Sequence, residues 1–574
     1  MNEIRALNLE PMNGIRVLDD LSVRRIIPIF PAPVKIRILM ICEGLAFDSQ
    51  DGFSFKIMID AIRDKSGVKF ANFELTLASW GSSSGATVFK NPAAADYEAT
   101  YENYRFGAND PDSGQLILDA FDEVWLFGIT PGNNFAVKTA DILASPLAPS
   151  NSELKVLHRW MNAGGGVLAM GDHASLGASL CARVPRVWTM RRWSEEDGAP
   201  PRITPERIDT NQPMWASQDP AFTTSPQMIP FDAQSDDVAQ TIEVKRYHHI
   251  VRGWRPHPLL CGGKLGVIDR LPDHPHEGWC VDPQDLSADV LFPVDTGTNA
   301  REYPDFGGAP LPPEVIAWGH SSADPPLNLA KGPTTSRRFG IVGAYDGHIA
   351  SVGRVVVDST WHHWMSINLS GTYASVTEPS GQPLVGLKEA NDKAYKQILQ
   401  YYRNVAVWLA PGPRQIQMLM YSIWWSVFSY NAFEDWRTDT PVLHLGRHGR
   451  DVLGRATSDC FVHRWLRELL PLQIYQGWRE FEPLPPPLPL RPNRPVLDDL
   501  QVFALGTLMR HAMKFRDELQ QNPEVARTLT SNELRQRLDD ALASTRKEVS
   551  ATFVKHMMRE RERLGSMIDS VVNR

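Results

Sequence analysis

Residues 150–181 read SNSELKVLHRWMNAGGGVLAMGDHASLGASLC, and this stretch decides the fold class. It opens with Ser-x-x-Glu at 150–153, which is the spacing of a capping box at the start of a helix. Apolar residues then recur at helical spacing as far as the three glycines at 164–166, which end the helix. The apolar run VLAM at 167–170 predicts a buried strand, and a second helix follows the turn Gly-Asp-His. A helix, a strand and a helix in succession are typical of an α/β layer built on a parallel sheet.

Short apolar runs of the same character lie on both sides of this stretch. We expect strands at 35–42, 73–78, 123–127, 314–318 and 354–358. A helix between the first two of these strands has Phe55, Met58, Ile59 and Ile62 on one face, and Gly67 ends it. This alternation predicts a doubly wound parallel sheet with helices on both faces.

The rest of the chain differs from this alternating pattern. Periodicity is poor between about 183 and 312, which indicates an insertion over the sheet and not one ordinary loop. From about 388 the pattern becomes helical, and a proline-rich segment near 490 predicts a polyproline II linker. We therefore divide the chain into an N-terminal arm (1–34), an α/β domain (35–370) with the insertion at about 183–312, a helical region (371–482), a proline-rich linker (483–497) and C-terminal helices (498–574).

Composition and charge narrow the class of protein. The 574 residues carry a formal net charge of −8, which argues against a nucleic-acid partner. The five cysteines are scattered without a Cys-x-x-Cys pair, so we expect neither a disulfide framework nor a cysteine-based zinc finger. The chain does not start with the apolar run of a signal peptide, and its most apolar later stretch, at 418–428, covers about half a bilayer. We therefore expect a cytoplasmic protein with no membrane partner, and the lack of a Gly-x-x-x-x-Gly-Lys loop predicts no nucleotide cofactor.

Histidines gather in one third of the chain, where ten of the sixteen lie between His173 and His363. Several come directly after predicted strands, and the loops that follow parallel strands converge at the carboxyl edge of the sheet, where ligands bind. His320 follows one such strand. We expect a catalytic group at this edge that consists of Glu43, Asp172, His173 and His362. The alternative for each histidine is an ordinary surface or hydrogen-bonded core residue.

The string Asp-His-Pro-His-Glu-Gly at 273–278 lies within the insertion. In extended chain His274 and His276 point to the same side, because side chains repeat every two residues. With Glu277 beside them they form a donor set that suits Zn²⁺, Mn²⁺ or Fe²⁺, and we predict a metal site there. A bound cation would polarise a carbonyl group or generate hydroxide from water. The string matches no strict zinc pattern, so exposed histidines are the alternative.

The segment WTMRRW supplies two adjacent arginines after the second predicted helix. Arg191 and Arg192 are candidates to bind a carboxylate or phosphate of a small polar substrate, since guanidinium groups pair with both. Nucleophilic alternatives are weaker. There is no Gly-x-Ser-x-Gly elbow, Ser175 has the position of a helix cap, and Cys42 and Cys181 have positions typical of buried residues.

The layout resembles the class I glutamine amidotransferase-like superfamily, and ThuA-like proteins in particular. The resemblance covers about 35–180 and 313–370, and it rests on KIRILMICEG, FDEVWLFGITPG, the helix followed by GGGVLAMGDHASLG, and GRVVVDSTWHHW. It implies a flavodoxin-like doubly wound sheet. In the glutaminase members a nucleophilic cysteine occupies the turn where this chain has Asp172 and His173, and a histidine follows the last strand, near His362.

Because the elbow cysteine is missing, we expect no glutamine hydrolysis by the family's acyl-enzyme route. Our leading hypothesis is a metal-assisted hydrolase of unknown substrate on an amidotransferase-like sheet. The alternative is a catalytically degenerate binding or assembly module whose C-terminal helices dock a protein partner. A sugar-related activity is a third hypothesis, and it rests on analogy with ThuA-like proteins alone.

Overall fold

The computed structural model describes residues 32–43, 54–94, 97–128, 138–171, 177–199, 239–249, 253–272, 279–294, 300–306, 308–321, 337–366, 369, 388, 391–429, 436–457, 459–470 and 494–572. The chain forms two compact units. The α/β unit is Lys35–Gln415, and the helical unit contains the described residues from Ile416 onward.

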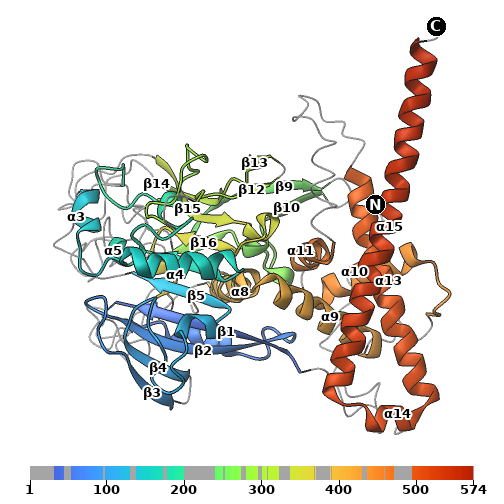
Figure 1. Ribbon diagram of the computed structural model, residues 1–574, viewed down its shortest axis with the longest axis horizontal. Helices are drawn as coiled ribbons and strands as arrows, with labels where there is room; N and C mark the ends of the chain where they lie inside the picture. The colour runs from blue at the N-terminus through green and yellow to red at the C-terminus, as the bar shows by residue number, and fades with distance from the viewer. Residues whose placement is uncertain are drawn as a thin grey trace, which may run out of the picture. The chain divides into compact units, whose positions relative to one another are not determined.

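A ten-stranded sheet forms the centre of the α/β unit (Figure 1). Its strands are β1 (Val34–Cys42), β2 (Ala71–Trp80), β3 (Phe89–Ala94), β4 (Tyr97–Tyr104), β5 (Glu123–Phe127), β6 (Gly166–Met170), β8 (Glu243–Val244), β14 (Glu314–Ser321), β15 (Arg337–Tyr345) and β16 (Val355–Asp358). They lie in the order β3-β4-β2-β1-β5-β6-β16-β15-β14-β8.

The sheet is mostly parallel, with antiparallel strands towards both margins. The pairs β1–β5, β5–β6, β6–β16 and β2–β4 are parallel. At one margin β3 runs antiparallel to β4. At the other margin β15 runs antiparallel to both β16 and β14, so β14 has the same direction as β16. The fold is therefore mixed α/β, and the prediction of an entirely parallel sheet needs correction at its margins.

Helices and small sheets complete this unit. The α-helices are α2 (Lys56–Arg63), α3 (Thr139–Leu143), α4 (Asn151–Asn162), α5 (Ala178–Cys181) and α8 (Asp392–Leu409). The 3-10 helices are η2 (Ile117–Ala120), η3 (Trp188–Met190), η5 (Pro258–Leu260), η6 (Gly263–Leu265), η8 (Gly347–Ala350) and η9 (Trp361–His363). Three two-stranded antiparallel sheets pair β7 (Ala239–Thr241) with β11 (Arg270–Pro272), β9 (Arg246–His249) with β10 (Gly253–Pro256), and β12 (Asp305–Phe306) with β13 (Ala309–Pro310).

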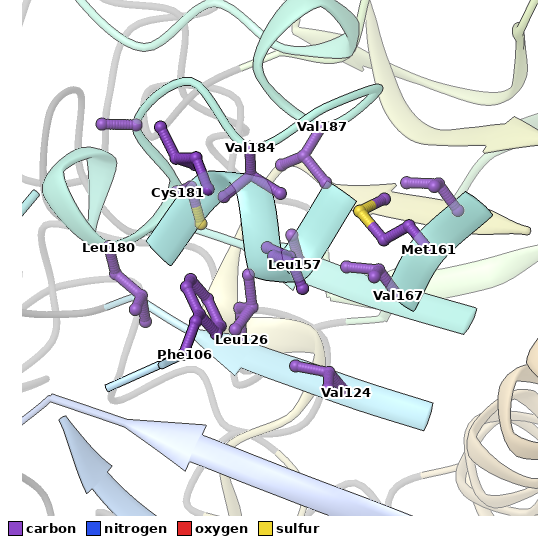
Figure 2. Close-up of a cluster of buried hydrophobic side chains, with 14 of the residues drawn as sticks. Phe106, Val124, Leu126, Leu157, Met161, Val167, Leu180, Cys181, Val184 and Val187 are labelled. Atoms are coloured by element: carbon purple, nitrogen blue, oxygen red, sulfur yellow. The ribbon is translucent and has the colours of Figure 1, made fainter. Parts of the chain in front are cut away.

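Both faces of the central strands are buried, and this explains why those strands are continuously apolar. On one face Leu126 of β5 belongs to a core cluster with Leu157 of α4 and Leu180 of α5 (Figure 2). On the other face the neighbouring residue Trp125 lies against Trp364, with ring centroids 5.7 Å apart. Side chains alternate between the two faces along each strand, and because both faces are covered, every residue of β5 is buried.

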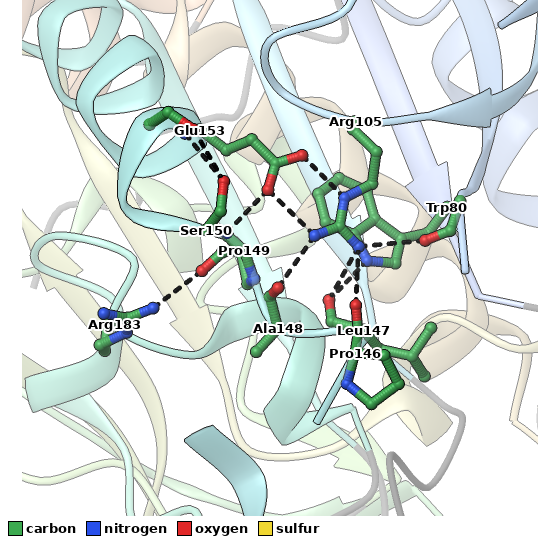
Figure 3. A network of polar contacts seen from close by, with 11 residues as sticks. Trp80, Arg105, Pro146, Leu147, Ala148, Pro149, Ser150, Glu153 and Arg183 are labelled. Carbon is green, nitrogen blue, oxygen red and sulfur yellow. Dashed lines mark hydrogen bonds and ion pairs between the residues drawn. The ribbon is translucent and has the colours of Figure 1, made fainter. Parts of the chain in front are cut away.

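A buried ion pair fixes the start of α4 (Figure 3). The capping box is confirmed, because Ser150 Oγ accepts from the backbone N–H of Glu153 while the Glu153 carboxylate accepts from that of Ser150. The same carboxylate binds the Arg105 guanidinium through two hydrogen bonds of 2.8 and 3.0 Å. Arg105 also donates to the carbonyls of Gly81 and Ala148. These contacts join the end of β4 to α4 at the carboxyl edge of the sheet.

The helical unit consists of long helices that pack on α13. It contains most of α9 (Gly412–Ser429), with α10 (Val442–Ala456), α11 (Asp459–Leu469), α13 (Arg494–Gln521), α14 (Pro523–Thr528) and α15 (Ser531–Val572). α10, α11 and α15 all contact α13. Of the helices that the structure describes, none has the length and apolar character needed to cross a membrane.

Candidate functional site

The carboxyl end of β16 holds a buried carboxylate and a buried imidazole in direct contact. Asp358 is the last residue of the strand, and His363 ends the short helix η9 that follows it. His363 Nδ1 lies 2.7 Å from Asp358 Oδ1, and both side chains are fully buried. The Nδ1 contact is an ion-pair distance without the alignment of a hydrogen bond, and the other ring nitrogen, His363 Nε2, is buried with no hydrogen-bond partner among the described residues. A histidine held in this way can present Nε2 as a proton acceptor.

The second oxygen of Asp358 is fixed by two aromatic donors. Trp364 Nε1 and the Tyr401 hydroxyl each donate to Asp358 Oδ2 over 3.1 Å. Burial and the neighbouring Asp358 raise the pKa of Tyr401 well above its usual range, so the phenol keeps its proton and stays a donor. Tyr402 of the same helix donates to the backbone carbonyl of His363. α8 therefore fixes both members of the Asp358–His363 pair.

The chain beyond the pair is fixed against the start of α2. The backbone N–H of Ser366 donates to the Ser54 carbonyl over 2.8 Å. Its hydroxyl accepts from the backbone N–H of Ile57 over 3.2 Å and lies 3.2 Å from the Ser54 hydroxyl. The first N–H groups of a helix have no acceptor within the helix, so the Ser366 hydroxyl also stabilises the start of α2.

Arg191 lies next to the Asp358–His363 pair and is 1% exposed. Its Nη2 donates to the Ser359 carbonyl over 2.9 Å, and Ser359 directly follows Asp358. Its guanidinium stacks on Trp193, with 4.3 Å between the guanidinium carbon and the ring centroid. A buried, stacked guanidinium is a suitable group for binding a carboxylate or a phosphate.

Two buried thiols, those of Cys181 and Cys280, have pKa values that depend on charged groups of the same region. Burial raises the pKa of the Cys181 thiol; Glu43 raises it further, while Arg191 lowers it. Burial also raises the pKa of the Cys280 thiol. The charge of Asp358 raises this pKa further, and the charge of Arg191 lowers it. Both sulfurs are therefore within electrostatic reach of Arg191. A thiol with a raised pKa is a poor nucleophile, so neither cysteine fits an acyl-enzyme role.

The structure describes four of the residues predicted for the site. Glu43, Arg191 and His362 are all buried, while Arg192 is half-buried and its backbone N–H donates to the Trp279 carbonyl. His362 lies in η9 beside His363, with its ring centroid 4.5 Å from that of Trp361. Five predicted residues lie outside the described residues: Asp172, His173, His274, His276 and Glu277.

The remaining candidate, His320, belongs to a different surface. It lies within β14, not in a turn after it, and its side chain is 52% exposed. Its Nε2 lies 3.3 Å from Glu243, which also binds Arg338 through two 2.7 Å hydrogen bonds. β15 separates this group from β16. His320 is therefore not part of the Asp358–His363 group.

Sequence reasoning does not select Asp358 and Tyr401 as site residues. The His-His pair after the last strand is a visible signal, but of the two histidines only His362 is placed in the predicted catalytic group. The final carboxylate of RVVVD was another signal, because a charged residue that ends a buried strand needs a partner. Tyr401 lies 43 residues further along the chain, and no local pattern connects it to Asp358.

Within the part of the chain that the structure describes, no group of three or more histidine, cysteine or carboxylate side chains could hold a metal ion. Comparison with known proteins adds no relative: no family model, no curated protein and no solved structure matches this chain.

Proposed function

We propose that the α/β unit is an amidotransferase-like hydrolase domain without glutaminase activity, acting on a small polar substrate that carries an anionic group. The strand order supports the amidotransferase-like part. Taken in chain order, β2-β1-β5-β6-β16 is 2-1-3-4-5, which is the flavodoxin-like order, with its switch point at the ends of β1 and β5. Glu43 follows β1 at this edge, and the Asp358–His363 pair follows β16.

The observation that carries the proposal is the 2.7 Å contact between His363 Nδ1 and Asp358 Oδ1 beside a buried arginine. In our account Asp358 orients the ring, and His363 Nε2 takes a proton from the attacking water. The same proton then passes to the leaving group as its bond to the substrate breaks. Arg191 binds the anionic group of the substrate or the negative charge that develops on it. The hydrolysis needs no enzyme nucleophile, so the missing elbow cysteine is no obstacle.

We also propose a divalent cation held by His274, His276 and Glu277. This part rests on the sequence pattern alone. The cation would supply Lewis-acid activation of the substrate or its water. Metal content of the purified full chain, measured by mass spectrometry, tests it: near-stoichiometric zinc, manganese or iron that is lost in a folded H274A/H276A variant supports the site. A metal-free protein after reconstitution contradicts it.

Hydrolysis of a panel of chromogenic esters, amides, phosphates and glycosides tests the proposed activity. The informative variant is H363Q, which removes the base but keeps a polar side chain. H257Q is the matched control, because His257 is also buried (1% exposed) but accepts from the Leu259 backbone N–H and packs on Trp408. We expect activity that falls about 100-fold or more in H363Q and persists in H257Q. Equal activity in both variants contradicts the assignment of His363.

A second candidate function is a binding or assembly module in the cytoplasm. The observation that favours it is burial: Asp358 and His363 have no exposed side-chain surface, whereas a catalytic group must meet its substrate. The thiols of Cys181 and Cys280, which form no disulfide, fit a reducing compartment. A chain that hydrolyses nothing in the panel, and that loses a specific protein partner when 498–574 are deleted, would favour this function.

A further inference from the structure

Two histidines lie one turn apart on an exposed face of α10. His444 and His448 have the i, i+4 spacing that places side chains next to each other on a helix. Both are exposed, whereas Gly446 and Arg450, on the opposite side of the helix, are buried. The two histidines therefore face away from the interior of the helical unit and contribute nothing to its core.

The two rings are already arranged side by side. They are nearly parallel, with an interplanar angle of 9° and ring centroids 6.5 Å apart. Trp436 packs against both rings, with its centroid 4.5 Å from that of His448 and 5.7 Å from that of His444. An aromatic ring in contact with both imidazoles restricts their rotamers, and this lowers the entropy lost when they bind a common ligand.

We propose that His444 and His448 form a two-histidine site for a transition-metal cation that prefers imidazole, namely Zn²⁺, Ni²⁺ or Cu²⁺. A metal at 2.0–2.1 Å from a ring nitrogen lies about 3.2 Å from the ring centroid, so two rings on one tetrahedral metal have centroids about 5 Å apart. Closing the observed separation to that value needs only small side-chain rotations of exposed residues. The same residue types at the same helical spacing supply two ligands in helix-borne zinc sites.

The chemistry of the site selects the class of cation. Imidazole nitrogen is a good ligand for Zn²⁺, Ni²⁺ and Cu²⁺, while Mg²⁺ and Ca²⁺ require oxygen ligands. Two protein ligands leave further coordination positions for water or for donors of another molecule. Arg447, which precedes His448, has its charge balanced by Asp499 at 3.6 Å. This site is separate from the proposed hydrolase centre and does not depend on it.

Calorimetric titration of Ni²⁺ into the full chain tests the proposal. We expect a binding event, distinct from that of the His274–His276 site, that weakens about 100-fold in H444Q and in H448Q, because each variant removes the chelate effect. H511Q is the matched control: His511 lies on a helix of the same unit but faces Glu548 at 3.9 Å. Repeating the titration in H274A/H276A separates the two proposed metal sites, and the event must persist there. The proposal is overturned if H444Q and H448Q both bind Ni²⁺ as tightly as the full chain does. It is also overturned if the full chain shows no binding event that H444Q weakens.

Fluorescence provides a second measurement that does not depend on calorimetry. Bound Cu²⁺ quenches a nearby indole, and Trp436 lies against both histidines. We expect a saturable quenching step in the full chain that is lost in W436F and in H444Q/H448Q but retained in H511Q. A step of equal size in H444Q/H448Q overturns the proposal.

Discussion

Arg105 and Glu153 form a buried ion pair in which each partner depends on the other. Their side chains are only 4% and 5% exposed. Removing one charge of such a pair leaves the other buried and uncompensated, which costs about 3–5 kcal/mol. An exposed pair such as Arg159–Asp119, with side chains 59% and 50% exposed, contributes about 1 kcal/mol or less.

We therefore predict that E153Q lowers the free energy of unfolding by about 3 kcal/mol or more, whereas R159A lowers it by less than about 1 kcal/mol. Gln keeps an oxygen that can accept from the backbone N–H of Ser150, so the variant changes the charge and preserves the cap. Urea unfolding of the α/β unit measures both values. Similar losses in E153Q and R159A would show that the buried pair contributes no more than a surface pair.

Glu302 predicts a pH dependence of stability. It is buried, and its carboxylate accepts from the Arg186 backbone N–H and from Thr189 Oγ1. Burial raises the pKa of Glu302 to about 7, although Arg186 and Thr189 lower it in part. The folded state therefore binds the proton more tightly than the unfolded state, and stability falls as pH rises from about 4.5 to 7, by on the order of 3 kcal/mol.

The measurement is the difference in unfolding free energy between the natural chain and E302Q across pH 5 to 8. A difference is needed because burial and Arg186 lower the pKa of His158 to about 4, and this group contributes the opposite slope between about 4 and 6.5. We expect the natural chain to lose stability relative to E302Q as pH rises to 7 and to stay level above it. A constant difference across this range would contradict a raised pKa at Glu302.

The site was predictable from sequence only in part. The capping box at Ser150 follows from a local spacing, and the segment WTMRRW indicates Arg191 as a candidate to bind an anion. The identity of the histidine beside Asp358 does not, because η9 is a three-residue 3-10 helix, too short to show which way each ring points. The contact between Tyr401 and Asp358 depends on tertiary packing alone.

At the scale of elements, a close approach joins the end of β5 to the start of α5. Gly177 has φ +77°, and a Cβ placed there would lie 2.0 Å from the Gly128 carbonyl oxygen. Gly85 has a similar φ of +83° but open space around it. The two glycines therefore carry the same backbone strain when substituted but differ in steric contact.

We predict that G177A destabilises the chain by about 1–3 kcal/mol more than G85A, because the added methyl group must displace backbone that cannot give way. Thermal or urea unfolding of both variants measures the difference. Equal losses would mean that only the positive φ matters at Gly177 and that β5 and α5 can separate without cost.

The central strands were predictable; towards the margins β14 was predicted, at 314–318, but β3, β4, β8 and β15 were not. The strand expected at 123–127 is confirmed as β5, and that at 35–42 is confirmed within one residue as β1. β15 has two arginines at its start and contains Gly340, a residue disfavoured in strands. Glycine is required there because a Cβ would lie 2.2 Å from the Cys280 carbonyl oxygen. A requirement of this kind is visible only once the strand has its neighbours.

At the scale of the whole molecule, α8 is the element that completes the α/β unit. The predicted domain boundary at 370 groups this helix with the helical region, whereas the structure places it within Lys35–Gln415. Ile398, Tyr401, Tyr402 and Val405 are fully buried. At about 1.5–3 kcal/mol for each buried side chain, their burial is comparable with the whole stability of a domain, about 5–15 kcal/mol.

We therefore predict that a fragment of residues 1–415 unfolds in one cooperative transition, while a fragment of residues 1–370 does not fold. Circular dichroism and thermal unfolding of the two fragments make the comparison. A cooperative transition in the shorter fragment would show that α8 is dispensable and that Asp358 does not need Tyr401.

The central claim is that Asp358 fixes His363 so that Nε2 is a bare proton acceptor. The most direct measurement is the tautomer of the His363 ring, obtained by nitrogen-15 NMR of the histidine-labelled full chain. H363Q assigns the signal by its loss. We expect a proton on Nδ1, facing Asp358 Oδ1 at 2.7 Å, and none on Nε2, with the pattern lost in D358N. A proton on Nε2, or a spectrum that D358N leaves unchanged, would contradict the account.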